Sequence, residues 1–328
     1  MLQGKKVFVT GAGGFIGSHL VEALVMANAD VTAMIRYSSD AHWGNMELLP
    51  DAIKREIRVV AGNVEDSDFM MHSLKRQDIV FHLAALIAIP YSYVAPRSYV
   101  RTNVEGTLNV MEAVRRHDIP RVVHTSTSEV YGTALYAPID EAHPLQGQSP
   151  YSASKIGADK IAESYFLAFA TPVVTLRPFN TYGPRQSARA FIPTVISQAL
   201  AQPVIRMGSL EPQRDMTFVR DTALGFIAAG VTPGIEGETI NLGVGHTESI
   251  GTIAQRILKL MGCDKSIERD DVRIRPAKSE VLKLLSNNSK ARERLSWTPT
   301  VSLDEGLLET IEFVQKNLYL FKTNAYAI

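Results

Sequence analysis

Tyr151 and Lys155 are the two side chains of this sequence best suited to acid–base chemistry. Residues four positions apart lie on the same face of a helix. A phenol ionises at about pH 10, and a neighbouring ammonium group stabilises the phenolate and lowers that pKa. The pair therefore predicts a general base that takes a proton from a substrate hydroxyl.

A second group of reactive side chains lies upstream, in the string Ser-Thr-Ser-Glu-Val-Tyr-Gly at 126–132. Thr127 offers a hydroxyl that can hydrogen-bond to the phenol or to the substrate, and Glu129 offers a second base. Two bases and a hydroxyl donor indicate a reaction with more steps than alcohol oxidation.

The N-terminal segment reads as a strand, residues 7–10, that runs into a glycine-rich turn. Gly11 permits a tight turn, Gly14 lets the backbone approach a pyrophosphate, and Gly17 lets the following helix pack closely. The N-terminus of that helix would face the phosphates. The spacing is a variant of the common dinucleotide fingerprint. The turn expected to bind the dinucleotide comprises Gly11, Gly13, Gly14, Phe15, Ile16 and Gly17.

The end of the second predicted strand bears on the choice between NAD and NADP. An acid about 20 residues beyond the turn favours NAD, whereas a basic residue can accommodate the extra phosphate of NADP. Here the strand ends at Arg36, followed by Ser38 and Ser39, and Asp30 lies at its other end. Arg36 permits NADP, but it could also stack on the adenine of NAD. The expected cofactor is NAD(P)+, with this choice left open.

Short β-branched runs alternate with helical patterns through the first half of the chain. This rhythm predicts an α/β fold, a Rossmann-type doubly wound parallel sheet with helices on both faces. The expected strands are 7–10, 31–35, 57–61, 79–83, 121–125 and 173–176, and the expected helices lie near 16–28, 66–75, 97–117 and 150–170. Because ligands bind beyond the carboxyl ends of such strands, the segments that follow them should converge on one crevice.

Beyond residue 177 prolines punctuate shorter elements, so a second lobe is expected to begin there. We expect a dinucleotide-binding domain over 1–177, with returning segments near 218–245. A smaller C-terminal α/β lobe that binds the substrate is expected over 178–217 and 246–328. Within these segments, 218–227 and the strand-like 239–242 would rejoin the first domain, and 249–262 and 302–321 look like helices.

The composition is that of an ordinary globular protein, with 328 residues, 45% of them hydrophobic and 21% charged. Lys plus Arg equals Asp plus Glu at 34 each, so nothing predicts attraction to nucleic acid or to a membrane surface. The apolar run 83–89 is far shorter than the roughly 20 residues of a membrane span. Cys263 is the single cysteine, which excludes a multi-cysteine metal site. We expect a cytoplasmic protein without a metal.

Together these motifs resemble the extended short-chain dehydrogenase/reductase superfamily, in particular its nucleotide-sugar epimerase, dehydratase and decarboxylase branch. The resemblance covers nearly the whole chain and includes the strings at 82–85, 177–185 and 214–221. The Ser-Thr-x-Glu-Val-Tyr-Gly string is similar to that of 4,6-dehydratases and UDP-glucuronate decarboxylases, whereas simple 4-epimerases typically lack an acid where Glu129 stands. The segments 37–43, 86–93 and 184–190 are similar to the NDP-N-acetylglucosamine 4,6-dehydratases of legionaminic acid biosynthesis.

The resemblance implies a lyase that converts an NDP-hexose, such as NDP-GlcNAc, to its 4-keto-6-deoxy sugar. Tyr151, helped by Lys155 and Thr127, would take the proton of the 4-hydroxyl as hydride leaves C4. Glu129 would then remove the C5 hydrogen, the C6 hydroxyl would leave as water, and hydride would return to C6.

Ser128 departs from the related dTDP-glucose enzymes, in which an Asp at this position protonates the departing hydroxyl. We hypothesise that Glu129, or a bound water, delivers that proton instead. UDP-glucuronate decarboxylation stays a serious alternative, because it shares the first step and the same string. A non-catalytic dinucleotide-binding sensor is a third reading, disfavoured because the reactive side chains are all present.

The resemblance also implies binding roles for side chains outside this group. Towards the cofactor these are Arg36, Asn63, Val64, Leu83, Ala84 and Ala85, together with Tyr151 and Lys155. Towards the substrate diphosphate they are Asn180, Arg185, Arg189, Arg214 and Arg275, whereas Arg177 is expected to tie strands to loops. The family commonly forms homodimers or tetramers by packing the helices near 97–117 and 150–170 into a four-helix bundle.

Overall fold

The computed structural model describes residues 2–274 and 276–321. Among these, seven parallel strands form one sheet in the order β11-β6-β5-β4-β1-β2-β3. Their bounds are β1 (Lys6–Thr10), β2 (Asp30–Arg36), β3 (Ile57–Gly62), β4 (Ile79–His82), β5 (Val122–Thr125), β6 (Val173–Pro178) and β11 (Thr239–Leu242). The strand order reverses between β1 and β4, which is where doubly wound sheets bind their ligands. The predicted Rossmann-type fold is confirmed.

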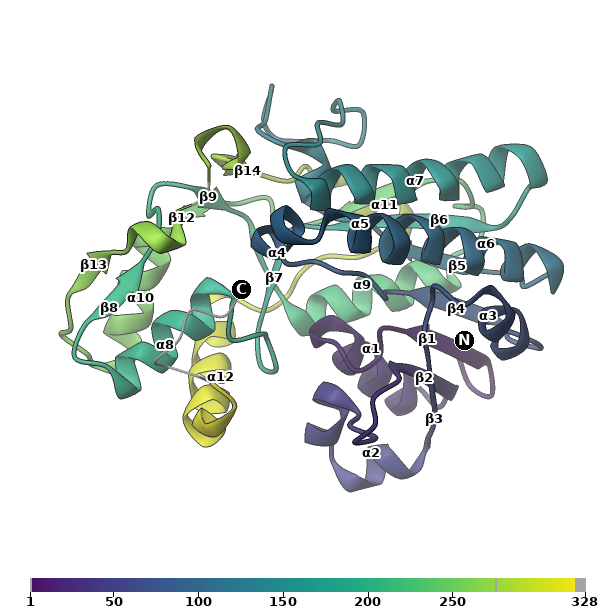
Figure 1. The fold of residues 1–328 in the computed structure, drawn as a ribbon, viewed down its shortest axis with the longest axis horizontal. Helices are drawn as coiled ribbons and strands as arrows, with labels where there is room; N and C mark the ends of the chain where they lie inside the picture. Colours follow the sequence, from purple (N-terminus) through teal and green to yellow (C-terminus); the bar gives the residue numbers. More distant parts are fainter. Residues whose placement is uncertain (1, 275, 322–328) are drawn as a thin grey trace.

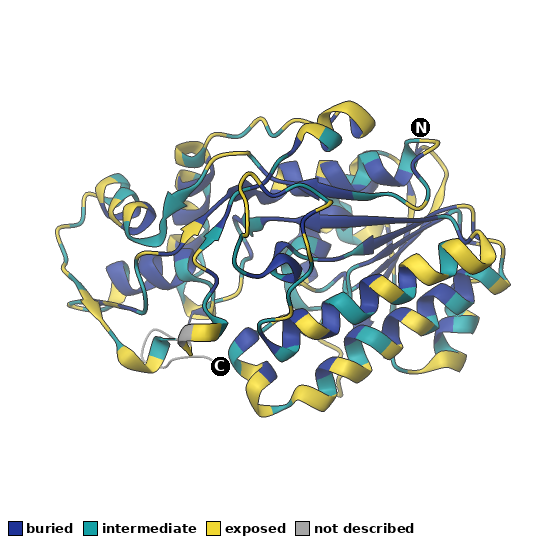
Figure 2. Cartoon of the chain, turned by 90° about the horizontal axis from the view of Figure 1, so that it is seen from above, coloured by how far each residue is buried: buried dark blue, intermediate teal, exposed yellow. Residues whose placement is uncertain are grey.

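Helices cover both faces of the sheet, and Figure 2 shows the buried strands between them. On one face α1 (Phe15–Met26) packs against α9 (Val219–Val231), and their apolar residues share a core with the strands. On the other face lie α3 (Ser67–Ser73), α6 (Gly106–Arg116) and α7 (Pro150–Phe169), with a second core. Burial on both faces explains why the strands read as continuous apolar runs.

The helix expected near 97–117 is divided into three parts. A short helix, α5 (Pro96–Tyr99), leads into a π-helical turn, η2 (Val100–Glu105), and then into α6. The side chain of Asn103, within the π turn, hydrogen-bonds both backbone groups of Leu86 and the hydroxyl of Ser154. The irregular turn therefore joins the loop after β4 to helix α7.

A smaller lobe lies to the left in Figure 1, around a core of its own. Its main helices are α8 (Phe191–Ala201), α10 (Ile250–Met261) and α12 (Leu303–Lys316). Its short strands pair as β7 (Asn180–Tyr182) with β10 (Met216–Phe218), β8 (Ile205–Met207) with β13 (Ile267–Arg269), and β9 (Gln213–Arg214) with both β12 (Glu248–Ser249) and β14 (Lys283–Leu284). The expected domain boundaries themselves stay a prediction.

The remaining helices are short, and several border the cleft described below. They are η1 (Gly44–Leu48), α2 (Asp51–Arg55), α4 (Ile89–Val94), η3 (Ser128–Tyr131), η4 (Asp271–Arg273), η5 (Ala277–Ser279), α11 (Ser289–Leu295) and η6 (Leu318–Leu320). In the described part of the chain, none of the helices combines the length and apolar character needed to cross a bilayer.

Candidate active site

A cleft of about 1440 Å³ lies beyond the carboxyl ends of the strands, between the sheet and the smaller lobe. Ligand pockets usually measure about 300–1,000 Å³, so this one has room for a dinucleotide and a second ligand. The predicted site residues that line it are Gly11, Gly13, Gly14, Phe15, Ile16, Gly17, Arg36, Asn63, Val64, Leu83, Ala84, Ala85, Thr127, Ser128, Glu129, Tyr151, Lys155, Asn180, Arg189 and Arg214.

The glycine-rich turn has the close backbone packing that its sequence predicts. Gly11 has a φ of +69°, and a Cβ there would stand 2.7 Å from the backbone nitrogen of Ala84. A Cβ on Gly17 would stand 2.2 Å from the carbonyl oxygen of Gly11. Helix α1 begins here with no side-chain cap, so its first N–H groups face the cleft end of β1. This arrangement fits a pyrophosphate, whose oxygens accept from such N–H groups.

Helix α7 sets the positions of the tyrosine and the lysine. Ser149 caps the helix in a reciprocal pair of hydrogen bonds with Ser152, which places Tyr151 in the first turn and Lys155 one turn later. Both side chains are buried, and the Nζ atom of Lys155 donates to the carbonyl oxygen of Thr125 at 2.6 Å. Their side chains reach the cleft from the same helix, as the spacing predicts.

The electrostatics of this pair differ from the simple expectation. Burial raises the pKa of Tyr151 above its ordinary value, whereas a hydrogen bond with the Thr127 hydroxyl acts to lower that pKa. Burial lowers the pKa of Lys155 to about 8, although the charge of Asp159 acts to raise it. Desolvation disfavours the charged form of each group, and it outweighs the stabilisation of the phenolate expected from the ammonium.

Glu129 lies on η3, directly after β5, where Thr127 caps the turn and accepts from its backbone N–H at 3.2 Å. Glu129 and Tyr151 line the same cleft, and the charge of Glu129 contributes to the raised pKa of Tyr151. Its carboxylate has no hydrogen-bond or ion-pair partner among the described residues. Ser128 is buried beside it. Glu129 is therefore a carboxylate available to act on a bound ligand.

A buried hydrogen-bond network joins helix α7 to the strands β5 and β6 beside the site. Asp159, one turn after Lys155 on α7, accepts from Ser126, His124 and Arg177. Burial acts to raise the pKa of Asp159, but His124, Arg177 and Lys155 together lower it to about 2. Arg177 ties β6 to α7, the structural role that the sequence suggested.

The cofactor end of the cleft holds an acid that the sequence reasoning missed. Arg36 is exposed at the end of β2, and Asp40 lines the cleft in the loop that follows. Ser38 donates to Asp40 at 2.5 Å, and the backbone of Gly44 packs against Gly13. Strand periodicity does not predict a loop that folds back onto the glycine-rich turn. The sequence analysis considered Asp30 and Arg36 at the ends of the strand, and it therefore did not identify Asp40.

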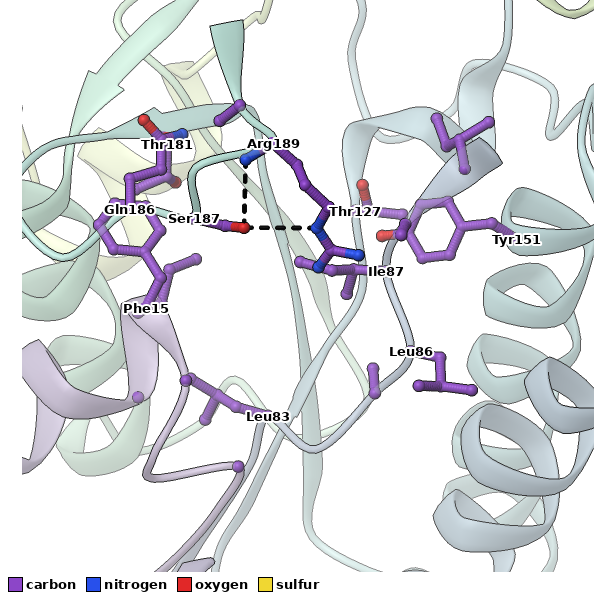
Figure 3. Close-up of a pocket in the computed structure, with 18 of the residues that line it drawn as sticks. Phe15, Leu83, Leu86, Ile87, Thr127, Tyr151, Thr181, Gln186, Ser187 and Arg189 are labelled. Atoms are coloured by element: carbon purple, nitrogen blue, oxygen red, sulfur yellow. Dashed lines mark hydrogen bonds between the residues drawn. The ribbon is translucent and has the colours of Figure 1, made fainter. Parts of the chain in front are cut away.

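The substrate end is lined by groups from the smaller lobe. Arg214 is buried and pairs with Glu280 at 3.4 Å, and Arg273 lines the cleft beside them. The Oδ1 atom of Asn180 is buried with no hydrogen-bond partner in the described part of the chain. Figure 3 shows Arg189 extending from its loop towards Thr127, Ile87 and Tyr151. Sequence reasoning missed Arg273 and Glu280, which lie far from any strand end of the main sheet.

The structure does not bring Arg185 into the cleft. It is buried against α1, where its guanidinium pairs with Glu22 and His19. The position of Arg185 therefore does not support a contact with the substrate phosphate. The sequence could not show this, because Arg185 and Glu22 are more than a hundred residues apart in the chain. Arg275, the remaining candidate, lies outside the described residues. Among those described, no group of three or more His, Cys, Asp or Glu side chains is arranged to hold a metal ion.

Comparison with known proteins agrees with this geometry. The family model described as "GDP-mannose 4,6 dehydratase" matches residues 8–310. A dTDP-glucose 4,6-dehydratase of Actinoplanes sp. is 31% identical over 95% of this chain and 98% of that protein. Among solved structures, a UDP-N-acetylglucosamine 4-epimerase from Methanobrevibacter ruminantium M1, in complex with UDP-N-acetylmuramic acid, has a TM-score of 0.87 and 30% identity, covering 96% of this chain and 99% of that one.

A dTDP-glucose 4,6-dehydratase double mutant from Streptomyces venezuelae, solved with NAD bound, has a TM-score of 0.88 and 27% identity, covering 97% of this chain and 99% of that one. Relatives of this chain thus include both dehydratases and epimerases with its fold. On the extent of the family match and the shared fold, the chain belongs to the GDP-mannose 4,6-dehydratase family, within the extended short-chain dehydrogenases/reductases.

Proposed function

We propose that the protein is an NAD(P)-dependent nucleotide-sugar 4,6-dehydratase. The observation that carries this proposal is the carboxylate of Glu129, which has no partner among the described residues and lines the same cleft as Tyr151 and the glycine-rich turn. A reaction that only moves a hydride to and from C4 needs one base, whereas elimination of water across C5 and C6 needs a second.

In this proposal Tyr151 takes the proton of the sugar 4-hydroxyl, and Thr127 and Lys155 stabilise the phenolate. The nicotinamide, when bound, supplies the hydride acceptor for C4 and the hydride donor for C6. The resulting 4-ketone acidifies the C5 hydrogen, which Glu129 removes. The C6 hydroxyl then leaves as water. With the hydride returned to C6 and a proton from solvent added at C5, the product is a 4-keto-6-deoxy sugar.

Proton delivery to the departing hydroxyl is assigned to Glu129 as well. Ser128, which stands where the related dTDP-glucose enzymes have an Asp, is buried, and its hydroxyl is too weakly acidic for this task. Glu129 would therefore return to the C6 oxygen the proton that it removed from C5.

For the substrate we propose an NDP-hexose with an N-acetyl group, NDP-GlcNAc. The loop after β4 supports this, since Leu86, Ile87 and Ile89 give the cleft an apolar wall that suits an acetyl methyl group. The epimerase relative from Methanobrevibacter ruminantium acts on UDP-N-acetylglucosamine. The nucleobase is left open.

The cofactor is NAD(P)+, as in the neighbour that was solved with NAD. Arg36 would favour NADP by pairing with its extra phosphate, whereas Asp40 would favour NAD by accepting from the ribose hydroxyls. Titration of each dinucleotide against an Arg36→Ala variant distinguishes the two, since a loss confined to NADP assigns Arg36 to the phosphate.

UDP-glucuronate decarboxylation is the second candidate. It is favoured by Arg189, whose guanidinium extends towards Tyr151 and could hold a sugar carboxylate. A non-catalytic sensor is disfavoured because Tyr151, Lys155, Thr127 and Glu129 all line the cleft. Turnover that disappears in Tyr151→Phe would exclude the sensor.

The proposal is tested by incubating the protein and NAD+ or NADP+ with UDP-GlcNAc, GDP-GlcNAc, dTDP-glucose and UDP-glucuronate, followed by NMR of the products. A methyl doublet at C6 supports dehydration. A pentose indicates decarboxylation, and a C4 epimer that keeps its C6 hydroxyl indicates epimerisation.

We also propose a cytoplasmic homodimer that packs α6 and α7 against their copies in a four-helix bundle. Exposed apolar side chains on these helices support it: Leu108 is 38% exposed, Leu167 74% and Phe169 54%. Burial of such apolar side chains against a partner subunit would stabilise the dimer.

A further inference from the structure

Arg185 lies outside the cleft, but it connects the two walls of the cleft. Its guanidinium pairs with Glu22, and its Nη2 atom donates to Nδ1 of His19 at 2.7 Å. Both partners are on α1, the helix that begins at the glycine-rich turn. The loop after β7 is thus fastened to the cofactor helix.

His19 makes a further contact with the same loop, because its Nε2 atom lies 2.9 Å from the carbonyl oxygen of Pro184. The Nε atom of Arg185 also lies 3.1 Å from Nε2 of the ring. A ring protonated at Nε2 donates to Pro184 and accepts from Nη2 at Nδ1, and it then gives up only the Nε contact. Burial, followed by the charge of Arg185, lowers the pKa of His19 to about 3, so the ring stays neutral at physiological pH. The neutral ring can therefore bridge Arg185 and Pro184.

The backbone of Arg185 makes a second link. Its φ of +67° lies in the left-handed region, which a residue other than glycine adopts only when its surroundings hold it there. Its carbonyl oxygen accepts from the side chain of Asn45 at 2.9 Å, and the backbone N–H of Asn45 donates to the carbonyl oxygen of Gly13 at 2.9 Å. Two hydrogen bonds therefore connect the glycine-rich turn to Arg185.

The residues that follow Arg185 face the substrate part of the cleft. Gln186, Ser187 and Arg189 line it, and Figure 3 shows them opposite Tyr151. Their loop is anchored on one side by Arg185 and on the other by Gln186, whose side chain donates to the carbonyl oxygen of Thr181 at 2.9 Å. The placement of this loop against the glycine-rich turn depends on the Arg185 anchor.

We propose that Arg185 is a positioning residue that fixes the substrate-facing segment 186–190 on the cofactor-facing helix α1, so that dinucleotide and nucleotide sugar strengthen each other's binding. The inference rests on the proposed function for the identity of the two ligands. Because coupling between two binding sites is reciprocal, the factor is the same whichever ligand binds first.

The positioning role is tested without ligands, by amide hydrogen exchange of the full chain. Arg185→Leu, Glu22→Gln and Asn45→Ala should each speed exchange about tenfold in the segment 184–191, through local opening, and leave α10 unchanged. Arg294→Leu is the matched control, because it removes a guanidinium whose partners, Glu238 and the Gly234 carbonyl, lie away from the cleft. Unchanged exchange in the two milder variants, Glu22→Gln and Asn45→Ala, would overturn the role even if Arg185→Leu fails to fold.

The coupling is tested by calorimetry with UDP, GDP and dTDP, each with and without saturating NAD+ or NADP+. In the unaltered chain the dinucleotide should tighten nucleoside diphosphate binding about fivefold or more. Arg185→Leu should keep the affinity for dinucleotide alone but lose the tightening, and Arg185→Lys should restore part of it. Tightening that persists in Arg185→Leu contradicts the coupling. If the unaltered chain binds none of these ligands, the proposed function and the coupling both fail, and the exchange result still decides the positioning role.

Discussion

The phenol of Tyr151 and the carboxylate of Glu129 both line the cleft, and the charge of Glu129 affects the ionisation of the phenol. Burial and the charge of Glu129 both raise the pKa of the phenol. A proton-accepting Tyr151 therefore depends on the Thr127 hydroxyl and on the positive charge of Lys155, with the nicotinamide adding its own charge when it binds. Glu129 is only partly buried.

Replacing Glu129 with Gln keeps the shape of the side chain but removes the second base. Oxidation at C4 should proceed, seen as the near-ultraviolet absorbance of reduced nicotinamide, while dehydration falls about 10²- to 10⁴-fold. Ser128→Ala is the control and should keep its rate, since no acid role is assigned to Ser128. Normal dehydration by Glu129→Gln, with unchanged exchange of the C5 hydrogen, would remove Glu129 from the mechanism.

The pH dependence of turnover should report Lys155. The pKa of this lysine is lowered to about 8, so its ammonium is present below that pH and is lost above it. Because the phenolate needs the positive charge, kcat/KM should fall as the pH rises through about 8. Lys155→Arg keeps a charge at all these pH values, so its profile should lack this descending limb although its rate is lower. An identical limb in both proteins would contradict the assignment.

At the scale of elements, the periodic segments could be predicted and the irregular ones could not. The expected strand at 239–242 is β11 without any shift, and the expected helix near 150–170 is α7. The π turn at η2 was not predictable, because it depends on bonds between Asn103 and distant residues. Asp40 was missed for the same reason, since its loop is shaped by packing on Gly13.

Helix α7 carries both Lys155, which we propose acts in catalysis, and the buried carboxylate of Asp159, which is expected to matter for stability. Asp159→Asn leaves the buried guanidinium of Arg177 without its partner charge, which should lower the free energy of unfolding by about 3–5 kcal/mol. Glu163→Gln, which affects an exposed pair with Lys160 on the same helix, should change it by no more than about 0.5 kcal/mol. Urea unfolding measures both, and a loss below about 1 kcal/mol for Asp159→Asn would contradict a stabilising role for the pair.

At the scale of the whole molecule, the sheet order and the cleft at its switch point follow from the alternation of strands and helices. A substrate-binding contribution from the smaller lobe was also expected, but not the full set of its side chains that line the cleft. Arg214 was predicted as a cleft residue because it lies in the string 214–221. Arg273 lies in no recognised string and was not predicted. Arg185 lies in the string 177–185 together with the cleft residue Asn180, but it faces α1. Ion pairs with remote segments hold Arg214 and Arg185, whereas Arg273 pairs with its near neighbour Asp270.

The proposed dimer predicts which surface substitutions separate its subunits. Leu108→Glu and Leu167→Glu place charges on the exposed faces of α6 and α7 and should shift the protein to monomers in sedimentation experiments, since a buried unpaired charge is costly. Leu224→Glu on α9, where Leu224 is 52% exposed, is the control and should leave the assembly unchanged. A dimer that survives both substitutions would place the interface elsewhere.

If the cleft eliminates water from a nucleotide hexose as proposed, the hydride removed from C4 is delivered to C6 of the same sugar. This transfer is tested most directly with a nucleotide sugar, GDP-GlcNAc or UDP-GlcNAc, that carries deuterium at C4, followed by NMR of the product. We expect the deuterium to move to the C6 methyl group and the C5 hydrogen to come from solvent. Deuterium that stays at C4 of a product with an intact C6 hydroxyl would contradict the proposed dehydration and identify an epimerase.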